Sequence, residues 1–156
     1  MAIRRVEPLA RHRGFIPVVT RWFIAEWPSW YGPDGPGNVA EDLEAFAASE
    51  QCLPVGFLVF EGHEPIGAGA LKATSIPSHP HLSPWAAAGF VLPQHRGKGV
   101  GSFLLQELVV KARQLGYEPV YCGTSTAKSL LARAGWSVVA VTELEGKDLT
   151  IFQRAA

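Results

Sequence analysis

The stretch that decides the fold is Phe90-Val91-Leu92-Pro93-Gln94-His95-Arg96-Gly97-Lys98-Gly99-Val100-Gly101-Ser102. Short apolar residues lead into Pro93, and three glycines then alternate with other residues where a helical apolar pattern begins. A glycine-rich turn leaves backbone N–H groups uncovered, because no side chain separates them from a ligand. The helix dipole and the cations of Arg96 and Lys98 add attraction for phosphate. The stretch therefore predicts a pyrophosphate-binding turn.

Two other nucleotide-binding motifs do not fit this spacing. A Walker loop needs Gly-x-x-x-x-Gly-Lys-Ser/Thr, and the chain has no such segment. The dinucleotide fingerprint needs Gly-x-Gly-x-x-Gly with an acidic residue about 20 residues further on. This chain instead has Gly97-x-Gly99-x-Gly101, and the acidic residue is Glu118, directly before Pro119. A glycine-rich turn that binds no ligand remains the plain alternative.

The run Arg96-x-x-Gly99-x-Gly101, entered from a strand that ends at Pro93, resembles the acetyl-CoA signature of the GNAT acetyltransferase superfamily. The apolar patterns agree with this family along the whole chain. They predict strands at 3–6, 55–60, 65–73, 85–92, 119–123, 136–142 and 149–152, and helices at 15–27, 39–47, 100–115 and 126–134. The resemblance implies a single α/β domain over 1–156 with the GNAT fold. That fold is a mixed, mostly antiparallel sheet of about seven strands with four helices, in which parallel strands 4 and 5 splay apart.

Two further segments refine these predictions. Three prolines and three glycines between 28 and 37 predict an irregular loop without helix. Asn38 followed by Glu41 is a capping-box pattern that starts the second helix. The pairs Leu82-Ser83-Pro84-Trp85 and Gly135-Trp136 resemble a bacterial subgroup of GNAT proteins whose acceptors are mostly unassigned.

The composition excludes several classes of function. Fourteen basic and fourteen acidic side chains cancel, so no field favours nucleic acid or an anionic membrane. Cys52 and Cys122 are too few for a disulfide framework and are interpreted as small core residues in a reducing cytosol. Neither a signal core nor an apolar run of membrane-spanning length is present, so we expect a cytoplasmic protein, as a monomer or homodimer.

The resemblance assigns the cofactor site residue by residue. In GNAT proteins the pantetheine arm of coenzyme A lies between the splayed strands and pairs with exposed backbone. This places Gly89, Phe90 and Val91 along pantetheine, and Arg96 to Ser102 around the pyrophosphate. The Val91 N–H is a candidate to polarise the thioester carbonyl of acetyl-CoA. Plain core packing of the Phe90 and Val91 side chains is compatible with these roles, since the proposed contacts use only backbone.

The implied reaction is direct attack of a neutral amine on acetyl-CoA, which a general base would assist. Glu26 is the first candidate for this base, because it ends the first helix beside the expected acceptor cleft. The alternative is that Glu26 is an ordinary solvated residue of this helix. His79 and His81 are second candidates. Two imidazoles without a further Cys, His or carboxylate nearby fall short of a metal site, so no metal is expected.

One position departs from the family pattern. GNAT enzymes often carry a Tyr near the coenzyme A sulfur as the acid for the leaving thiolate, and that position here is Leu131. The acid for the leaving thiolate is then Ser129, Thr124 or a water molecule, or the thiolate leaves without an acid. Cys122 lacks a neighbouring His in sequence to activate it as a nucleophile.

Aromatic residues crowd the first helix and the loop after it, namely Trp22, Trp27, Trp30 and Tyr31. They could wall a pocket for an apolar or aromatic amine, or form a second core cluster. The resemblance thus implies an acetyl-CoA-dependent N-acetyltransferase acting on a small-molecule or peptide amine. A non-catalytic acyl-CoA-binding or sensing module, which kept the turn and lost the acid, is the alternative.

Overall fold

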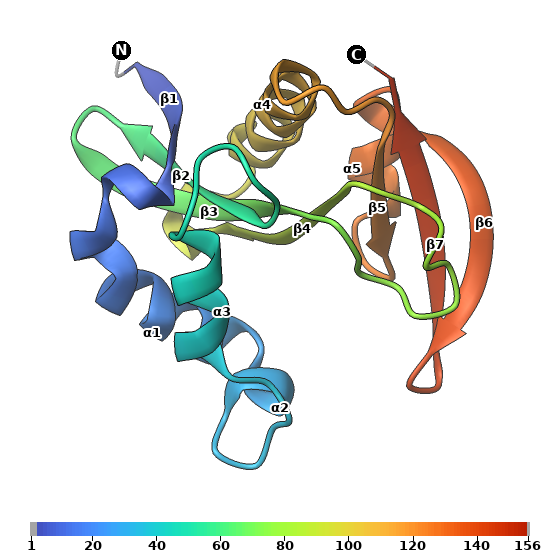
Figure 1. Cartoon of the computed structure of the whole chain (residues 1–156), viewed down its shortest axis with the longest axis horizontal. Helices are drawn as coiled ribbons and strands as arrows, with labels where there is room; N and C mark the ends of the chain where they lie inside the picture. The colour runs from blue at the N-terminus through green and yellow to red at the C-terminus, as the bar shows by residue number, and fades with distance from the viewer. Residues whose placement is uncertain (1–2, 156) are drawn as a thin grey trace.

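Seven strands form one sheet in the order β1-β2-β3-β4-β5-β7-β6 (Figure 1). The computed structural model describes residues 3–155. The strands are β1 (Arg4–Pro8), β2 (Val55–Glu61), β3 (Glu64–Lys72), β4 (Trp85–Val91), β5 (Val120–Thr124), β6 (Ser137–Leu144) and β7 (Lys147–Arg154). Every neighbouring pair is antiparallel except β4 and β5, which are parallel. The predicted GNAT-type sheet is confirmed, with β6 and β7 longer than expected.

Helices cover both faces of the sheet. They are α1 (Ile16–Glu26), α2 (Pro28–Tyr31), α3 (Val39–Phe46), α4 (Val100–Gln114) and α5 (Lys128–Arg133), with 3₁₀ turns at Leu9–Arg11, Arg13–Phe15 and Pro93–His95. In Figure 1, α4 lies above strands β2 to β4, whereas α1 and α3 lie below them. The strands in the middle of the sheet are therefore buried on both faces, which explains their nearly continuous apolar sequences.

The prediction that 28–37 contains no helix is wrong for its first four residues, which form α2. Pro28 stands at the first helical position, where the missing N–H breaks no hydrogen bond and the fixed φ suits the helix. Tyr31 N donates to Trp27 O at 2.8 Å, and Gly32 N donates to Pro28 O at 2.8 Å. The structure therefore has this short helix in addition to the four predicted.

Two apolar clusters hold the layers together. On one face, Leu104 and Leu108 of α4 are buried against the sheet. On the other face, Phe23 of α1 and Leu43 of α3 pack on Phe60 of β2. Full burial of such a side chain contributes about 1.5–3 kcal/mol, so these contacts fix α1 and α4 relative to β4.

The predicted cap of α3 is confirmed, whereas the predicted burial of one cysteine is wrong. Asn38 Oδ1 accepts a hydrogen bond from Glu41 N at 3.0 Å at the start of α3. Cys52 is exposed in the loop after that helix, so the expectation of a core residue is wrong for it, whereas Cys122 is half-buried. Within residues 3–155, no helix combines the length and apolar character needed to span a membrane.

Candidate active site

Strands β4 and β5 pair at one position only, where Trp85 lies opposite Tyr121. Tyr121 N also donates to Pro84 O at 2.9 Å at this end of the strands. Beyond this point the two strands diverge, and a cavity of about 410 Å³ lies between them. Its wall is mostly small or apolar and includes Ala86, Ala88, Leu104, Leu108, Cys122 and Leu131. The predicted splay thus opens an apolar slot in the middle of the sheet.

A bulge in β4 shapes one wall of this slot. Ala68 pairs with Phe90 and Ala70 pairs with Ala87, so two residues of β4 face one residue of β3. One of the two, Ala88, has a φ of 54°, which costs a non-glycine residue about 1–2 kcal/mol. The other, Gly89, has open space around it, because nothing lies within 4 Å of where a Cβ would stand.

The backbone of Val91 faces away from β3. Leu92 N donates to Ile66 O at 2.9 Å, and bonding to a neighbour alternates along an antiparallel strand. The N–H and C=O of Val91 therefore point to the open side of β4. The carbonyl accepts a hydrogen bond from Arg96 Nε at 2.7 Å. By the same alternation the backbone of Phe90 is directed at β3, whereas Gly89 lies in the bulge and lines the slot.

A second cavity, of about 600 Å³, lies at the start of α4. Gly97 has a φ of 76° and Gly99, the N-cap residue of α4, a φ of 83°. No side chain caps the helix, so the first N–H groups of α4 lack a partner from the cap residue. Gly101 lies in the helix with an ordinary φ, and a Cβ there would contact Leu130 Cδ2 at 3.4 Å. Left-handed backbone is thus required at two of the three glycines.

The two cavities adjoin. Gly89, Val91, Gly101 and Leu130 line both of them. The start of α4, with Val100 and Ser102 also at the cavity wall, is therefore connected to the slot between β4 and β5. The sequence-predicted residues come together here, apart from Lys98, which is exposed and does not line either cavity.

Two basic residues at the second cavity were missed by the sequence analysis, His95 and Arg133. Arg133 lies in the last turn of α5 and stands three residues after Leu130, on the same side of that helix. No local sequence pattern marks Arg133, because its place depends on the contact of Leu130 with Gly101 at the start of α4. A guanidinium at this place adds attraction for a phosphate.

Glu26 lies at the second cavity, at the end of α1. Its Oε2 lies 3.0 Å from Arg96 Nη2 in an ion pair that is partly exposed on both sides. The candidate base is thus beside Val91 and the glycine-rich turn, with one carboxylate oxygen bound to Arg96. Neither His79 nor His81 lines the cavities.

Leu131 is 1% exposed and packs in the apolar cluster with Trp136, while it also forms part of the slot wall. Thr124 lines the slot, and its Oγ1 accepts from Thr126 N at 3.2 Å and from Ala127 N at 2.8 Å, which leaves its O–H proton for donation. Ser129 is exposed and lines neither cavity. Burial raises the pKa of the Cys122 thiol to about 12, which opposes a nucleophilic role.

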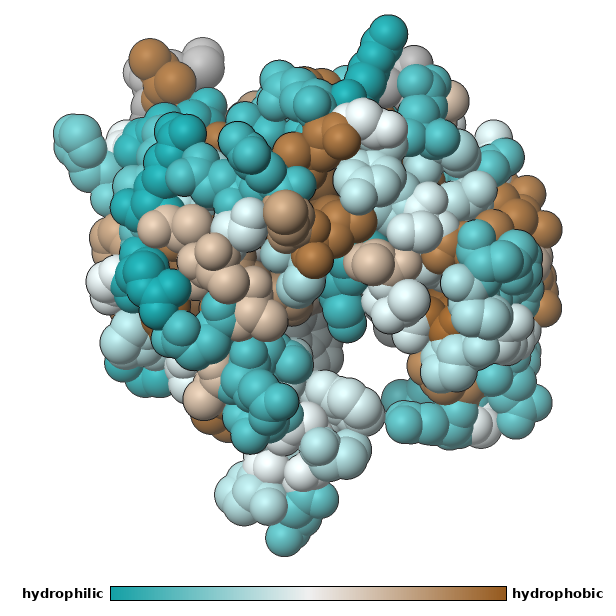
Figure 2. All heavy atoms as spheres, in the orientation of Figure 1, coloured by the Kyte–Doolittle hydropathy of each residue, from teal (hydrophilic) through white to brown (hydrophobic). Residues whose placement is uncertain are grey.

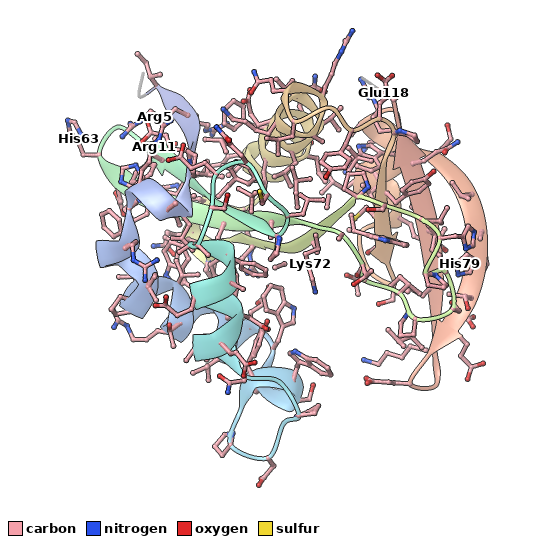
Figure 3. All side chains as sticks on the ribbon, viewed as in Figure 1. Arg5, Arg11, His63, Lys72, His79 and Glu118 are labelled. Atoms are coloured by element: carbon pink, nitrogen blue, oxygen red, sulfur yellow. The ribbon has the colours of Figure 1, made fainter. Side chains whose placement is uncertain are left out.

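His79 and His81 lie with ring centroids 5.8 Å apart, and Ser78 Oγ is 2.8 Å from His79 Nδ1. Figure 3 shows His79 in the loop before β4, beside the β6–β7 hairpin. Across residues 3–155, no group of three or more His, Cys, Asp or Glu side chains is arranged to hold a metal ion.

The predicted aromatic residues differ in place: some pack against other elements, and one lines the slot. Trp22 stacks on Phe90, with centroids 5.2 Å apart, and so props β4 from α1. Tyr31 donates to Asp42 Oδ2 at 2.7 Å; burial and this hydrogen bond raise the pKa of its phenol. Trp27 lines the slot, and Trp30 is 44% exposed. Of the four predicted aromatics, one therefore forms part of the cavity wall.

Comparison with known proteins agrees with this geometry. Residues 16–135 match the model of the acetyltransferase (GNAT) family. This match covers more than half of the chain, so the protein belongs to the GNAT family and is an acetyltransferase. A search of curated proteins finds no match.

Solved structures share the fold at low sequence identity. The Salmonella typhimurium acetyltransferase yncA, solved with its cofactor acetyl-CoA, is 17% identical with a TM-score of 0.74, over 97% of this chain and 93% of that one. The aminoglycoside 6'-N-acetyltransferase of Enterococcus faecium is 12% identical with a TM-score of 0.75, over 97% and 96%. The N-acetylglutamate synthase of Neisseria gonorrhoeae, complexed with coenzyme A and N-acetyl-glutamate, is 18% identical with a TM-score of 0.69, over 99% and 35%.

Proposed function

We propose that this acetyltransferase moves the acetyl group of acetyl-CoA directly to a primary amine, on a small molecule or an exposed peptide. The observation that carries the proposal is the shared wall of the two cavities, at Gly89, Val91 and Gly101. It joins a phosphate-attracting helix start to a narrow apolar slot with free backbone groups. Coenzyme A has the same sequence of parts, a pyrophosphate followed by an arm that carries amides.

Each part of this path has a role in holding the cosubstrate. The uncapped N–H groups at the start of α4 would bind the pyrophosphate, with Arg133 and Arg96 beside them. Gly89 and Val91 would pair with the amides of the pantetheine arm. When bound, acetyl-CoA supplies a thioester carbon that an amine can attack. The Val91 N–H, directed at the slot, is the group we propose to stabilise charge on the thioester oxygen.

The proposed reaction also needs a group that accepts a proton from the amine. An amine with a pKa near that of free lysine, about 10.4, must lose a proton before it attacks. We propose Glu26 for this task, since it borders the cavity and only its Oε2 is engaged within the described chain. No hydroxyl stands at position 131 to protonate the sulfur. A thiol with a pKa of about 8.5 leaves readily as the thiolate, so turnover does not require that acid.

Ligand-dependent melting tests the cosubstrate. Acetyl-CoA and coenzyme A should raise the melting temperature, while NAD and ATP should raise it far less. A hundredfold excess over Kd stabilises the fold by about 2.7 kcal/mol, which is several degrees for a chain of this size. Absence of a shift with millimolar acetyl-CoA would show that the two cavities do not bind it.

An amine panel tests the transfer. Thiol release from acetyl-CoA is followed over time, and intact mass identifies acetylated products. Amine-dependent thiol release with a mass gain on the amine supports catalysis. Binding of acetyl-CoA without release for any amine would instead favour the alternative, an acyl-CoA-binding module whose loss of the acid at Leu131 abolished turnover.

A further inference from the structure

Lys72 ends β3 on the face of the sheet that carries α1 and α3. Side chains two residues apart share a face of a strand, so Lys72 lies on the same face as Ala70, which packs in the cluster of α1 and α3. In the sheet register Ala70 lies opposite Ala87, a residue of the slot wall, and Lys72 lies opposite Trp85. Lys72 is therefore a diagonal neighbour of the slot, just past the region that the helices cover.

The side chain points into an open groove. Figure 3 shows Lys72 projecting from the end of β3 toward the space between the α1–α2 arm and the β6–β7 hairpin. Figure 2 shows that the molecule is hollowed at this place. Trp27, at the end of α1, and Leu149, on β7, line the slot from the two sides of the groove. The groove is thus the way by which an acceptor would reach the slot.

The charges around this groove are uneven. The residues that line the slot include no Asp, Glu, Lys or Arg. Lys72 is half-buried, and within residues 3–155 no ion pair or side-chain hydrogen bond engages it. Glu26, the carboxylate at the neighbouring cavity, is paired with Arg96. The stem of Lys72 is partly covered, and its ammonium, which points into the groove without a partner among the described residues, can pair with an anion.

Acidic residues of the hairpin are placed differently. Glu143, Glu145 and Asp148 are exposed around the turn between β6 and β7, and the exposed Lys147 lies among them. The tip of this hairpin lies on the other side of the open space from Lys72 (Figure 3). These hairpin residues are exposed, whereas Lys72 is half-buried.

We propose that the acceptor is a small molecule that carries a carboxylate as well as the primary amine, as an amino acid does. Lys72 binds the carboxylate, the apolar body of the molecule lies against Trp27, and the amine enters the slot. One ammonium matches a monoanion, which favours a carboxylate over a phosphate. Lys72 acts as a specificity-determining residue. The inference rests on the proposed function and names the substrate class of that site.

Matched acceptors test the carboxylate. Phenylalanine, phenylalaninamide and 2-phenylethylamine share one body and differ in the group that Lys72 would bind, and spermidine supplies a polycation. Rates are compared per neutral amine, because the carboxylate also changes the basicity of the amine. We expect kcat/KM to be about 10- to 100-fold higher for phenylalanine, the effect of one hydrogen bond to a charged group.

Variants locate the effect. Lys72→Met should remove the preference by raising KM for phenylalanine, with kcat and the KM for the two analogues that lack the carboxylate little changed. Lys72→Arg should retain part of the preference. Lys111→Met, which removes a similar cation on α4 away from the groove, should leave all values unchanged. A role of Lys72 in folding alone would lower the activity on every amine alike.

Other results would overturn the inference. A preference for 2-phenylethylamine or spermidine, or an unchanged preference in Lys72→Met, would show that Lys72 does not select the acceptor. If acetyl-CoA raises the melting temperature but no carboxylate-bearing amine is acetylated, the acceptor class is wrong and the cosubstrate stands. If acetyl-CoA itself fails to bind, the proposed function is wrong.

Discussion

Arg96 Nη2 lies 3.0 Å from Glu26 Oε2, although the two residues are 70 positions apart in the chain. The same guanidinium donates from Nε to Val91 O at 2.7 Å and lies over the Phe90 ring, 5.6 Å from its centroid. Arg96 thus joins the end of α1, the end of β4 and the turn before α4. A cation that the sequence analysis placed on phosphate also positions the strand whose backbone faces the slot.

Glu26→Gln should separate the two roles of this carboxylate. The ion pair is partly exposed, so its loss should change the free energy of unfolding by less than about 1 kcal/mol. If Glu26 is the base, kcat should fall by about 100-fold at neutral pH with an unchanged Kd for acetyl-CoA. Calorimetry and single-turnover rates provide these values. A weaker Kd with an unchanged chemical step would show that Glu26 only positions Arg96.

Gly99→Ala should weaken acetyl-CoA binding more than its effect on stability explains. The φ of 83° costs an alanine about 1–2 kcal/mol, and its Cβ would stand where the phosphate is expected. Gly116→Ala is the matched control, since Gly116 follows the other end of α4 with a φ of 93°. Both variants should melt at similarly lowered temperatures, but only the first should lose affinity. Normal binding by Gly99→Ala would place the phosphates elsewhere.

Arg133→Ala should reduce acetyl-CoA affinity more than Lys98→Ala. Arg133 lines the cavity at the start of α4, whereas Lys98 is exposed and does not line it. We expect a loss of about tenfold for Arg133, which is the scale of one charge-assisted hydrogen bond, and less than threefold for Lys98. Titration calorimetry at two salt concentrations measures both. Equal losses would mean that only the general field of the turn matters.

The strongest sequence signals predicted the parts of the site that depend on local backbone. The glycine spacing after Pro93 predicted the turn and the start of α4, because positive φ at Gly97 and Gly99 is a local requirement. The apolar patterns predicted the sheet because strands and helices differ in period. The strands and the glycine-rich turn were therefore predictable before the structure.

Contacts between distant segments were not predictable in this way. Arg133 is at the cavity wall because Leu130 of α5 lies beside Gly101 at the start of α4, and Arg96 pairs with Glu26 from a distant part of the chain. The local spacing of residues in the sequence predicts neither of these contacts. The direction of the Lys72 side chain likewise depends on the register of β3 with β4, which the pattern of one strand does not predict. Exposure of Cys52 follows from the course of one loop.

Thiol labelling should distinguish the two cysteines. Cys52 is exposed and should react first, whereas burial raises the pKa of Cys122 to about 12 and leaves little thiolate at pH 8. In Cys52→Ser, labelling should be slow, should accelerate as the pH rises, and should be slowed further by coenzyme A. Fast labelling of Cys122 at pH 7 would contradict the burial of its thiol.

The same shift predicts a loss of stability in alkali. The thiol of the unfolded chain ionises near pH 8.5, well below the folded value, so the unfolded state gains the charged form first. The contribution of Cys122 is therefore complete below about pH 8.5 and declines as the pH rises toward 12. Cys122→Ala should flatten this part of the stability curve, measured by urea unfolding. An unchanged slope would assign the decline to other groups.

Leu131→Tyr tests whether the missing acid can be restored. Leu131 both packs beside Trp136 and lines the slot, so a larger ring must project into the slot or strain the core. Leu131→Phe is the matched control, because it adds the same ring without the hydroxyl. Overpacking should lower the free energy of unfolding by about 1–3 kcal/mol in both variants.

The difference between the two variants isolates the hydroxyl. If the ring enters the slot, the phenol lies near the leaving sulfur, and Leu131→Tyr should exceed Leu131→Phe in single-turnover rate by a modest factor. The gain is small because the thiolate is already a fair leaving group. If the ring is forced into the core, the unpaired hydroxyl should make Leu131→Tyr less stable than Leu131→Phe by a further 1–3 kcal/mol or so, at equal rates. Equal rates with that stability gap would show that position 131 supports the core only, and that this protein releases the thiolate without a side-chain acid at α5.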